Sequence, residues 1–206
     1  EYYPRITRVC HSRLRTRVFA SQEVNIMMLC LLPIISIFLI ARELIVSILY
    51  SGEFRAIIPY ISFAIVGTVM RAYSWFLAIV IVARGDGKIY IVTETLSVLT
   101  GFALNVACYH LWGLAGLGVA FCLWYAAYCL IVGVVYFRSY GYSLSRQSSL
   151  LSLFTLAFCA AIVFLLNEGW LWAAIAATAI CLAFLLVKGI DAWPMMLAFA
   201  LIIVPF

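Results

Sequence analysis

The chain has 206 residues, of which 67% are hydrophobic and 10% are charged, and its formal net charge is +5. A soluble domain is usually nearer half apolar and a quarter charged, so this composition argues against a soluble protein and predicts an integral membrane protein. The basic residues lie beside long apolar segments. The preference of cytoplasmic loops for Lys and Arg therefore explains the net charge more simply than nucleic-acid binding, and we expect no nucleic-acid partner.

The ends of the sequence and its cysteines are also informative. The chain begins at Glu1 without an initiator Met and stops at Phe206 inside an apolar run, which suggests a piece of a longer protein. Six of the seven cysteines lie in apolar segments without paired spacing, where Cys behaves as a small hydrophobe. We therefore expect no disulfide framework, no metal site and no cofactor.

The first part of the chain divides into a polar segment and four apolar stretches. Residues 1–23 carry five arginines and are predicted to form a basic cytoplasmic loop. Residues 24–142 contain stretches long enough to cross a bilayer core about 30 Å thick. The four transmembrane helices predicted there span residues 24–50, 57–83, 89–111 and 114–137. Because the first stretch is long and contains Pro33, we expect that helix to be kinked or tilted.

The last part of the chain adds two more apolar stretches. Residues 150–191 predict an additional transmembrane helix pair, with spans near 150–166 and 170–187. Residues 192–206 are apolar but too short for a full crossing, so we expect a truncated span or an interfacial segment. The sequence as a whole predicts an all-α fold, a polytopic bundle of transmembrane helices.

The basic residues predict the orientation of this bundle. If residues 1–23 are cytoplasmic, the loops after the second, fourth and sixth spans lie on the same side, and these loops carry Lys and Arg. The basic residues of these loops are Arg84, Lys88, Arg138, Arg146 and Lys188. Only Arg55 falls in an outer loop, so we expect a multi-pass protein with residues 1–23 in the cytoplasm.

Arg71 is the most informative residue, because it lies near the middle of the predicted span 57–83, which holds no other charge. An arginine at the bilayer centre costs ~2.5–3.5 kcal/mol on insertion scales, and it remains charged. We therefore expect Arg71 to face water, a partner carboxylate or an anionic ligand. The alternative to a ligand is an ion pair with Glu94 or Glu43 that only holds helices together.

Stretches in order along the chain resemble the second half of bacterial polysaccharide flippases. Residues 2–8 (YYPRITR) are similar to the inner loop after their eighth helix, and residues 49–54 (LYSGEF) to the turn between the ninth and tenth helices. Residues 71–75 (RAYSW) are similar to the tenth helix. Residues 83–88 (ARGDGK) are similar to the inner loop that follows it, and residues 93–94 (TE) to the eleventh helix. Residues 113–121 (GLAGLGVAF) resemble the start of the twelfth helix.

The chain thus resembles the multidrug/oligosaccharidyl-lipid/polysaccharide (MOP) flippase superfamily, in its O-antigen translocase (Wzx-type) branch, over about residues 1–142. The resemblance implies the C-terminal portion of a MATE/MOP-like two-lobed transporter, with residues 24–142 as four helices of the second lobe. An N-terminal lobe of the same protein would supply the other wall of a cavity. Residues 150–191 look like the extra helix pair of the related lipid II flippases, which there forms a groove for a polyprenyl tail.

The implied substrate predicts the chemistry of the site. A flippase of lipid-linked sugars moves a diphosphate and a hydrophilic glycan past hydrocarbon, which requires a water-filled cavity with fixed cations. Arg71 is the leading candidate for contact with the diphosphate, because a planar guanidinium binds phosphate oxygens bidentately. Arg42 is a second candidate. It and Glu43 either snorkel to the interface or line the outer mouth of the cavity.

Four further residues complete the predicted substrate-binding set, namely Tyr73, Trp75, Glu94 and Asn105. The two aromatic residues either contact sugar rings or pack against lipid and neighbouring helices. Glu94 either forms a structural pair with Arg71 or Lys88, which is the favoured interpretation, or takes part in coupling to a cation. Asn105 is more often an interhelical hydrogen-bonding residue than a ligand contact.

The resemblance implies a transporter (flippase) that moves undecaprenyl-diphosphate-linked oligosaccharide, an O-antigen or related repeat unit of lipopolysaccharide. Transport would run from the cytoplasmic to the periplasmic leaflet of the bacterial inner membrane. The expected partners are this lipid-linked oligosaccharide, membrane lipids, the N-terminal lobe and a coupling cation. The alternatives are a cation-coupled multidrug exporter of the same fold, a membrane-embedded enzyme of glycan assembly and a purely structural anchor bundle. No catalytic motif is present, so we expect the protein not to be an enzyme.

Overall fold

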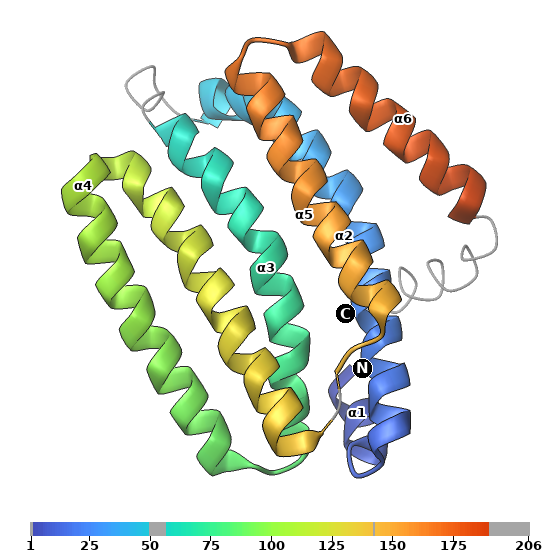
Figure 1. Ribbon diagram of the computed structural model, residues 1–206. Coiled ribbons are helices and arrows are strands. Elements are labelled where there is room, and N and C mark those ends of the chain that lie inside the picture. The colour runs from blue at the N-terminus through green and yellow to red at the C-terminus, as the bar shows by residue number, and fades with distance from the viewer. Residues whose placement is uncertain (1, 50–56, 142, 190–206) are drawn as a thin grey trace.

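The computed structural model describes residues 2–49, 57–141 and 143–189, and all regular structure in these ranges is helical. The elements shown in Figure 1 are, in chain order, α1 (Tyr2–Val9), α2 (Arg13–Leu49), α3 (Ile58–Ala83), α4 (Gly87–Val135), the π-helical turn η2 (Tyr136–Tyr140), α5 (Arg146–Asn167) and α6 (Leu171–Gly189). The predicted all-α fold is confirmed. Residues 50–54 of the flippase-like turn lie outside the described residues. The same is true of Arg55 and of the apolar segment 192–206.

Several helices are suited to a bilayer. Among the described residues, four helices are long and apolar enough, by length and composition, to cross a membrane: α2, α3, α4 continued by η2, and α5. The apolar part of α6, Leu171–Ala183, is shorter. Their outward faces carry large apolar side chains such as Leu99, Phe102 and Leu130, which are exposed. An apolar surface of this extent marks contact with another apolar phase. These features are those of a multi-pass membrane protein.

Helix α3 is the central element of the bundle, and its ends agree with the predicted span 57–83. Its first turn contains Pro59, where the missing N–H is not needed for an intrahelical bond. After Ala83 the chain turns through Gly85, which adopts a positive φ of 77°. Arg71 lies 13 residues after Ile58 and 12 residues before Ala83, so the structure places it at the middle of the helix.

Helix α4 is a hairpin of two limbs. Gly113 interrupts it with φ 60° and ψ −139°, a backbone conformation that is essentially restricted to glycine. The chain reverses there, and Figure 1 shows the two limbs lying side by side next to α3. The limbs, residues 87–112 and 114–135, correspond to the predicted spans 89–111 and 114–137. The hairpin brings residues far apart in sequence onto one face of α3.

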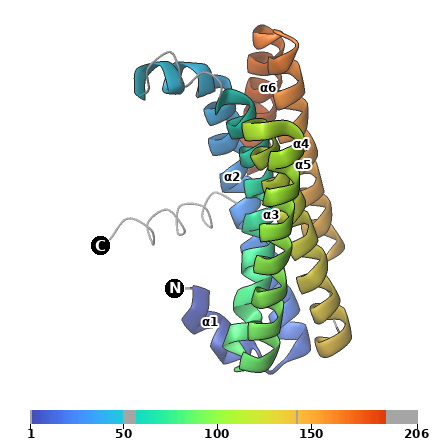
Figure 2. The same cartoon turned by 90° about the vertical axis from the view of Figure 1, so that its left-hand side faces the viewer.

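The N-terminal segment differs from the predicted loop 1–23, because most of its described residues are helical. Residues 2–9 form α1, and α2 begins at Arg13, well before the apolar stretch. Between Arg13 and Pro33 the chain contains no glycine or proline, so nothing interrupts the helix. Pro33 lies inside the continuous α2, and Figure 2 shows the C-terminal part of this helix turned away from the bundle axis.

The hydrophobic core lies where α2, α3 and α5 meet. Its fully buried side chains include Met28 and Leu39 of α2, Val80 and Ile81 of α3, and Ile162 of α5. Helix α6 packs on the outside of α2 and α5. The predicted pair 150–191 is helical over the described residues, and of its two helices α5 is among those long and apolar enough to cross a membrane. Helix α4 covers the other side of α3 (Figure 1). The core continues between α3 and the second limb of α4, where Tyr128 and Val132 are buried.

Candidate functional site

A cavity of about 220 Å³ lies between α3 and the two limbs of α4. Three of the six predicted substrate-binding residues line it: Arg71 and Trp75 of α3, and Glu94 of the first limb. Arg71 and Trp75 are four residues apart, so they share one face of α3. The other polar and aromatic residues of the lining are Ser74, Tyr90, Ser97, Trp124, Tyr125 and Tyr128. The cavity therefore combines a cation, a carboxylate, hydroxyl groups and aromatic rings.

Arg71 has an aromatic neighbour rather than an acidic one. Its guanidinium carbon lies 5.6 Å from the centroid of the Tyr125 ring, within the range of a cation–π interaction. Within the described residues no carboxylate forms an ion pair with Arg71, so the pairs with Glu94 or Glu43 that the sequence left open are not formed. The Arg71 side chain is exposed to the cavity, and its hydrogen-bond donors are available to an anion.

Glu94 is held by a phenol rather than by a basic residue. The hydroxyl group of Tyr128, on the second limb, donates a hydrogen bond to Oε1 of Glu94. Glu94 is half-buried, and neither Arg71 nor Lys88 forms an ion pair with it. The favoured interpretation of Glu94 as part of an ion pair with one of these residues therefore does not describe the structure. The carboxylate instead joins the two limbs of α4.

The second limb supplies an aromatic wall that the sequence reasoning missed. The rings of Trp124 and Tyr125 stack with centroids 5.0 Å apart, and Nε1 of Trp124 donates a 2.9 Å hydrogen bond to Oγ of Ser97. A Cβ atom added at Gly101 would lie 2.4 Å from the Trp124 ring, so only glycine gives the indole this space. The sequence signal was the spacing of 121, 124, 125 and 128, which places four aromatic residues on one helix face.

The remaining predicted residues lie away from this cavity. Tyr73 lines a different, mainly apolar hollow of about 350 Å³ between α3, the second limb of α4 and α5. The side-chain amide of Asn105 donates a 2.7 Å hydrogen bond to the carbonyl of Gly101 on its own helix. It therefore makes no interhelical bond among the described residues, contrary to the more common role of such an asparagine.

Arg42 is a buried residue that joins three helices. Its side chain is 4% exposed, and it donates hydrogen bonds to Oγ of Ser62 on α3 and, at 3.0 Å, to Oδ1 of Asn167 at the end of α5. It neither snorkels to a surface nor lines the cavity of Arg71. Glu43, the next residue, is exposed. The structure thus gives Arg42 a role in packing.

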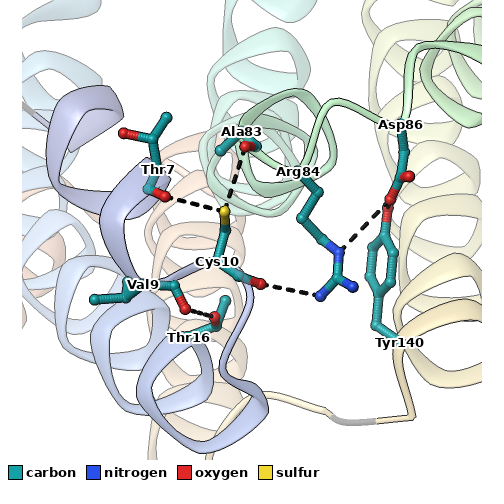
Figure 3. A network of polar contacts seen from close by, with 8 residues as sticks. All are labelled: Thr7, Val9, Cys10, Thr16, Ala83, Arg84, Asp86 and Tyr140. Atoms are coloured by element: carbon teal, nitrogen blue, oxygen red, sulfur yellow. Dashed lines mark hydrogen bonds and ion pairs between the residues drawn. The ribbon is translucent and has the colours of Figure 1, made fainter.

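A separate polar network closes the end of the bundle where the α3–α4 turn meets α1 (Figure 3). Arg84 forms an ion pair with Asp86 at 3.6 Å, donates a 3.0 Å hydrogen bond to the carbonyl of Cys10, and lies 4.2 Å from the ring centroid of Tyr140. The Tyr140 hydroxyl donates to Asp86 at 2.7 Å, and the Cys10 thiol donates to the carbonyl of Ala83 at 3.3 Å. The network attaches α1 and η2 to the turn.

Comparisons with protein-family profiles, curated proteins and solved structures find no match to this chain.

The chemistry of the cavity is that of binding. A cation with unused donors can hold an anionic group, and aromatic faces with nearby hydroxyls suit a polar ring. Within the described ranges no group of three or more His, Cys, Asp or Glu side chains is placed to hold a metal ion.

Proposed function

We propose that this chain is part of a transporter that flips a lipid-linked oligosaccharide across a membrane, with Arg71 contacting the diphosphate. In this proposal the chain is the C-terminal portion of a MATE/MOP-like two-lobed flippase, and an N-terminal lobe of the same protein forms the opposite wall. The substrate is undecaprenyl-diphosphate-linked oligosaccharide, moved from the cytoplasmic to the periplasmic leaflet of a bacterial inner membrane. Residues 1–23 are on the cytoplasmic side.

The observation that carries this proposal is the environment of Arg71. It is a permanent cation at the middle of an apolar helix, it lines a cavity, and no described carboxylate neutralises it. A charge at this depth is costly unless it faces water, a partner or a ligand, and intramembrane charges of this kind commonly mark a substrate pathway. A diphosphate supplies the missing negative charge and the paired oxygens that a guanidinium binds best.

The size and lining of the cavity support the same substrate class. At about 220 Å³ it is smaller than the ~300–1,000 Å³ of pockets that enclose drug-sized molecules. It therefore encloses only one part of a large substrate. The stacked rings of Trp124 and Tyr125 and the hydroxyl of Ser97 suit a sugar next to the phosphate. The order of the flippase-like sequence stretches around Arg71 adds independent support.

A cation-coupled exporter of the same fold is the second candidate, and one observation favours it. Glu94 lies in a cavity rich in aromatic rings, which is also the chemistry that binds organic cations. Its carboxylate is hydrogen-bonded to Tyr128, however, and Arg71 lines the same small space and repels a cationic ligand. The anionic substrate is therefore favoured.

The test is complementation of a strain that lacks its O-antigen flippase, using the full-length gene. Arg71→Ala should abolish surface glycan at normal protein abundance, and Arg71→Lys should restore only part of it, because an ammonium group lacks the bidentate geometry. Arg8→Ala, which removes an exposed arginine of α1, is the matched control and should be silent. Normal surface glycan with Arg71→Ala would refute the role of Arg71.

The exporter is separated by a second measurement in cells that carry the same variants. If the protein expels organic cations, Glu94→Gln should abolish resistance to ethidium, whereas Arg71→Ala should leave that resistance intact or increase it. A flippase gives no ethidium resistance with any variant.

A further inference from the structure

Five exposed arginines from two distant parts of the sequence gather near one end of the bundle. We call this surface the basic corner; its members are Arg13, Arg15, Arg17, Arg138 and Arg146. The first three belong to the start of α2, and the other two belong to η2 and to the start of α5. Each side chain is exposed. The fold therefore builds a positive surface that neither segment forms alone.

Specific contacts bring the two segments together. A Cβ atom added at Gly141 would lie 3.3 Å from Nη1 of Arg13, so the chain after η2 passes directly beside this guanidinium. The backbone N–H of Ser145 donates a 2.9 Å hydrogen bond to Oγ of Ser21, and the Ser148 hydroxyl donates to the Ser21 carbonyl at 3.1 Å. Arg17 lies one helical turn before Ser21, and Arg146 follows Ser145. Arg13, Arg17 and Arg146 thus lie at or next to the same contact.

The charge of the basic corner is not neutralised by the part of the chain that the structure describes. Within the described parts of the chain, none of its five arginines forms an ion pair with a carboxylate. Asp86, an acidic residue near this end, is bonded to Arg84 and Tyr140. Unpaired arginines at this density repel one another, so the surface is complementary to an anion outside the described chain.

Large apolar side chains are interleaved with these arginines. Leu14 and Val18, one turn apart on α2, are 76% and 57% exposed and alternate with the arginines. Phe137 is 72% exposed beside Arg138, and the exposed Leu150 lies one turn after Arg146. The phosphate backbone of a nucleic acid gives such apolar side chains no favourable environment. A bilayer surface does, because the apolar groups reach the acyl chains while the guanidinium groups reach the headgroups.

We propose that the basic corner binds the headgroup phosphates of anionic phospholipids in the leaflet at this end of the bundle. The planar guanidinium groups hold phosphate oxygens bidentately, and the exposed apolar residues between them lie among the first carbons of the acyl chains. Lipids held in this way join the start of α2 to the loop before α5. This binding is independent of the cavity of Arg71 and of any transported substrate.

The experiment measures which lipids stay with the purified full-length protein. The protein is equilibrated in mixed micelles with equal amounts of dioleoyl-phosphatidylglycerol and dioleoyl-phosphatidylcholine, re-isolated, and its retained lipids are counted by mass spectrometry. The wild type should retain phosphatidylglycerol preferentially, and 0.5 M NaCl should remove this preference. Arg13→Gln combined with Arg146→Gln should lower the preference about 25-fold, since each basic residue at a membrane surface contributes roughly five-fold.

Matched variants distinguish the basic corner from net charge. Arg8→Gln with Lys88→Gln removes the same charge from exposed residues outside the basic corner and should leave the preference unchanged. Arg13→Lys with Arg146→Lys keeps the charge and the fold, and should retain most of the preference even if the Gln variant is poorly produced. The proposal is overturned if Arg8→Gln with Lys88→Gln lowers the preference for phosphatidylglycerol as much as Arg13→Gln with Arg146→Gln does. It is also overturned if the wild type shows no such preference. Displacement of phosphatidylglycerol by a DNA oligonucleotide at low salt would also overturn it, in favour of nucleic acid.

Discussion

The guanidinium of Arg71 lies over the ring of Tyr125, 5.6 Å from its centroid, and this places the only charge of α3 against the face of an aromatic residue from α4. The contact stabilises the cation without neutralising it, because the ring offers a quadrupole and not a formal charge. Arg71 therefore stays available to an anion while its position is fixed by the second limb of α4.

Replacement of Tyr125 should reveal this interaction. Tyr125→Phe keeps the aromatic face and should leave transport by the full-length protein near the wild-type rate. Tyr125→Leu removes the face and should lower it by several-fold, corresponding to the ~0.5–2 kcal/mol of a cation–π contact. The measurement is export of lipid-linked oligosaccharide in reconstituted vesicles. If Tyr125→Phe is as damaging as Tyr125→Leu, the aromatic face does not act on the guanidinium.

The hydrogen bond between Tyr128 and Glu94 should stabilise the α4 hairpin. Tyr128→Phe leaves a half-buried carboxylate without its donor, so we expect the free energy of unfolding to fall by ~1–3 kcal/mol. Thermal unfolding of the full-length protein in detergent micelles measures this change. Tyr109→Phe, which removes the hydroxyl of an exposed tyrosine, is the control and should change the midpoint little. An unchanged midpoint for Tyr128→Phe would contradict the role of this bond.

Arg42 should matter for stability rather than for substrate binding. Arg42→Ala removes two charge-assisted hydrogen bonds that join α2 to α3 and α5, so we expect a loss of about 2–4 kcal/mol and low abundance in the membrane. Glu43→Gln changes the exposed neighbour and should be within ~0.5 kcal/mol of the wild type. Transport divided by the amount of folded protein should stay normal in Arg42→Ala. A loss of transport at normal abundance would instead return Arg42 to the substrate pathway.

The reversal at Gly113 offers a test of backbone strain without a steric clash. An added Cβ at Gly113 meets nothing within 4 Å, yet its positive φ is unfavourable for alanine, so Gly113→Ala should destabilise the protein by ~1–3 kcal/mol. Gly133 lies inside the second limb with equally open surroundings. Gly133→Ala should therefore stabilise the protein by ~0.5–1 kcal/mol. Thermal unfolding midpoints that move in the same direction for both variants would contradict this explanation.

Hydropathy alone predicted the helices well, because a span must be long and apolar wherever it lies in the bundle. The ends of α3, both limbs of α4 and the additional pair α5 and α6 all follow the predicted ranges. The helical character of residues 13–23 was missed, because charged residues were taken to indicate a loop. Arginine is a good helix former, so an amphipathic or polar segment can extend a transmembrane helix beyond its apolar part.

The site was harder to predict, because it depends on how each helix is rotated about its axis. The position of Arg71 at mid-helix followed from the sequence, but its partner Tyr125 is 54 residues away and depends on the reversal at Gly113. The same is true of Arg42, whose partner Asn167 lies 125 residues further along the chain. Polar residues inside apolar stretches can be recognised from sequence, whereas their pairing requires the packing.

The hairpin of α4 has a consequence for the assembly of the protein in the membrane. Glu94 and Tyr128 belong to two limbs that leave the ribosome one after the other, separated by a single reversal. Two adjacent limbs of this kind can enter the bilayer as one unit, with the carboxylate already hydrogen-bonded before it meets lipid. The polar groups that α4 contributes to the cavity therefore come from one hairpin, whereas α3, made earlier, contributes Arg71 and Ser74.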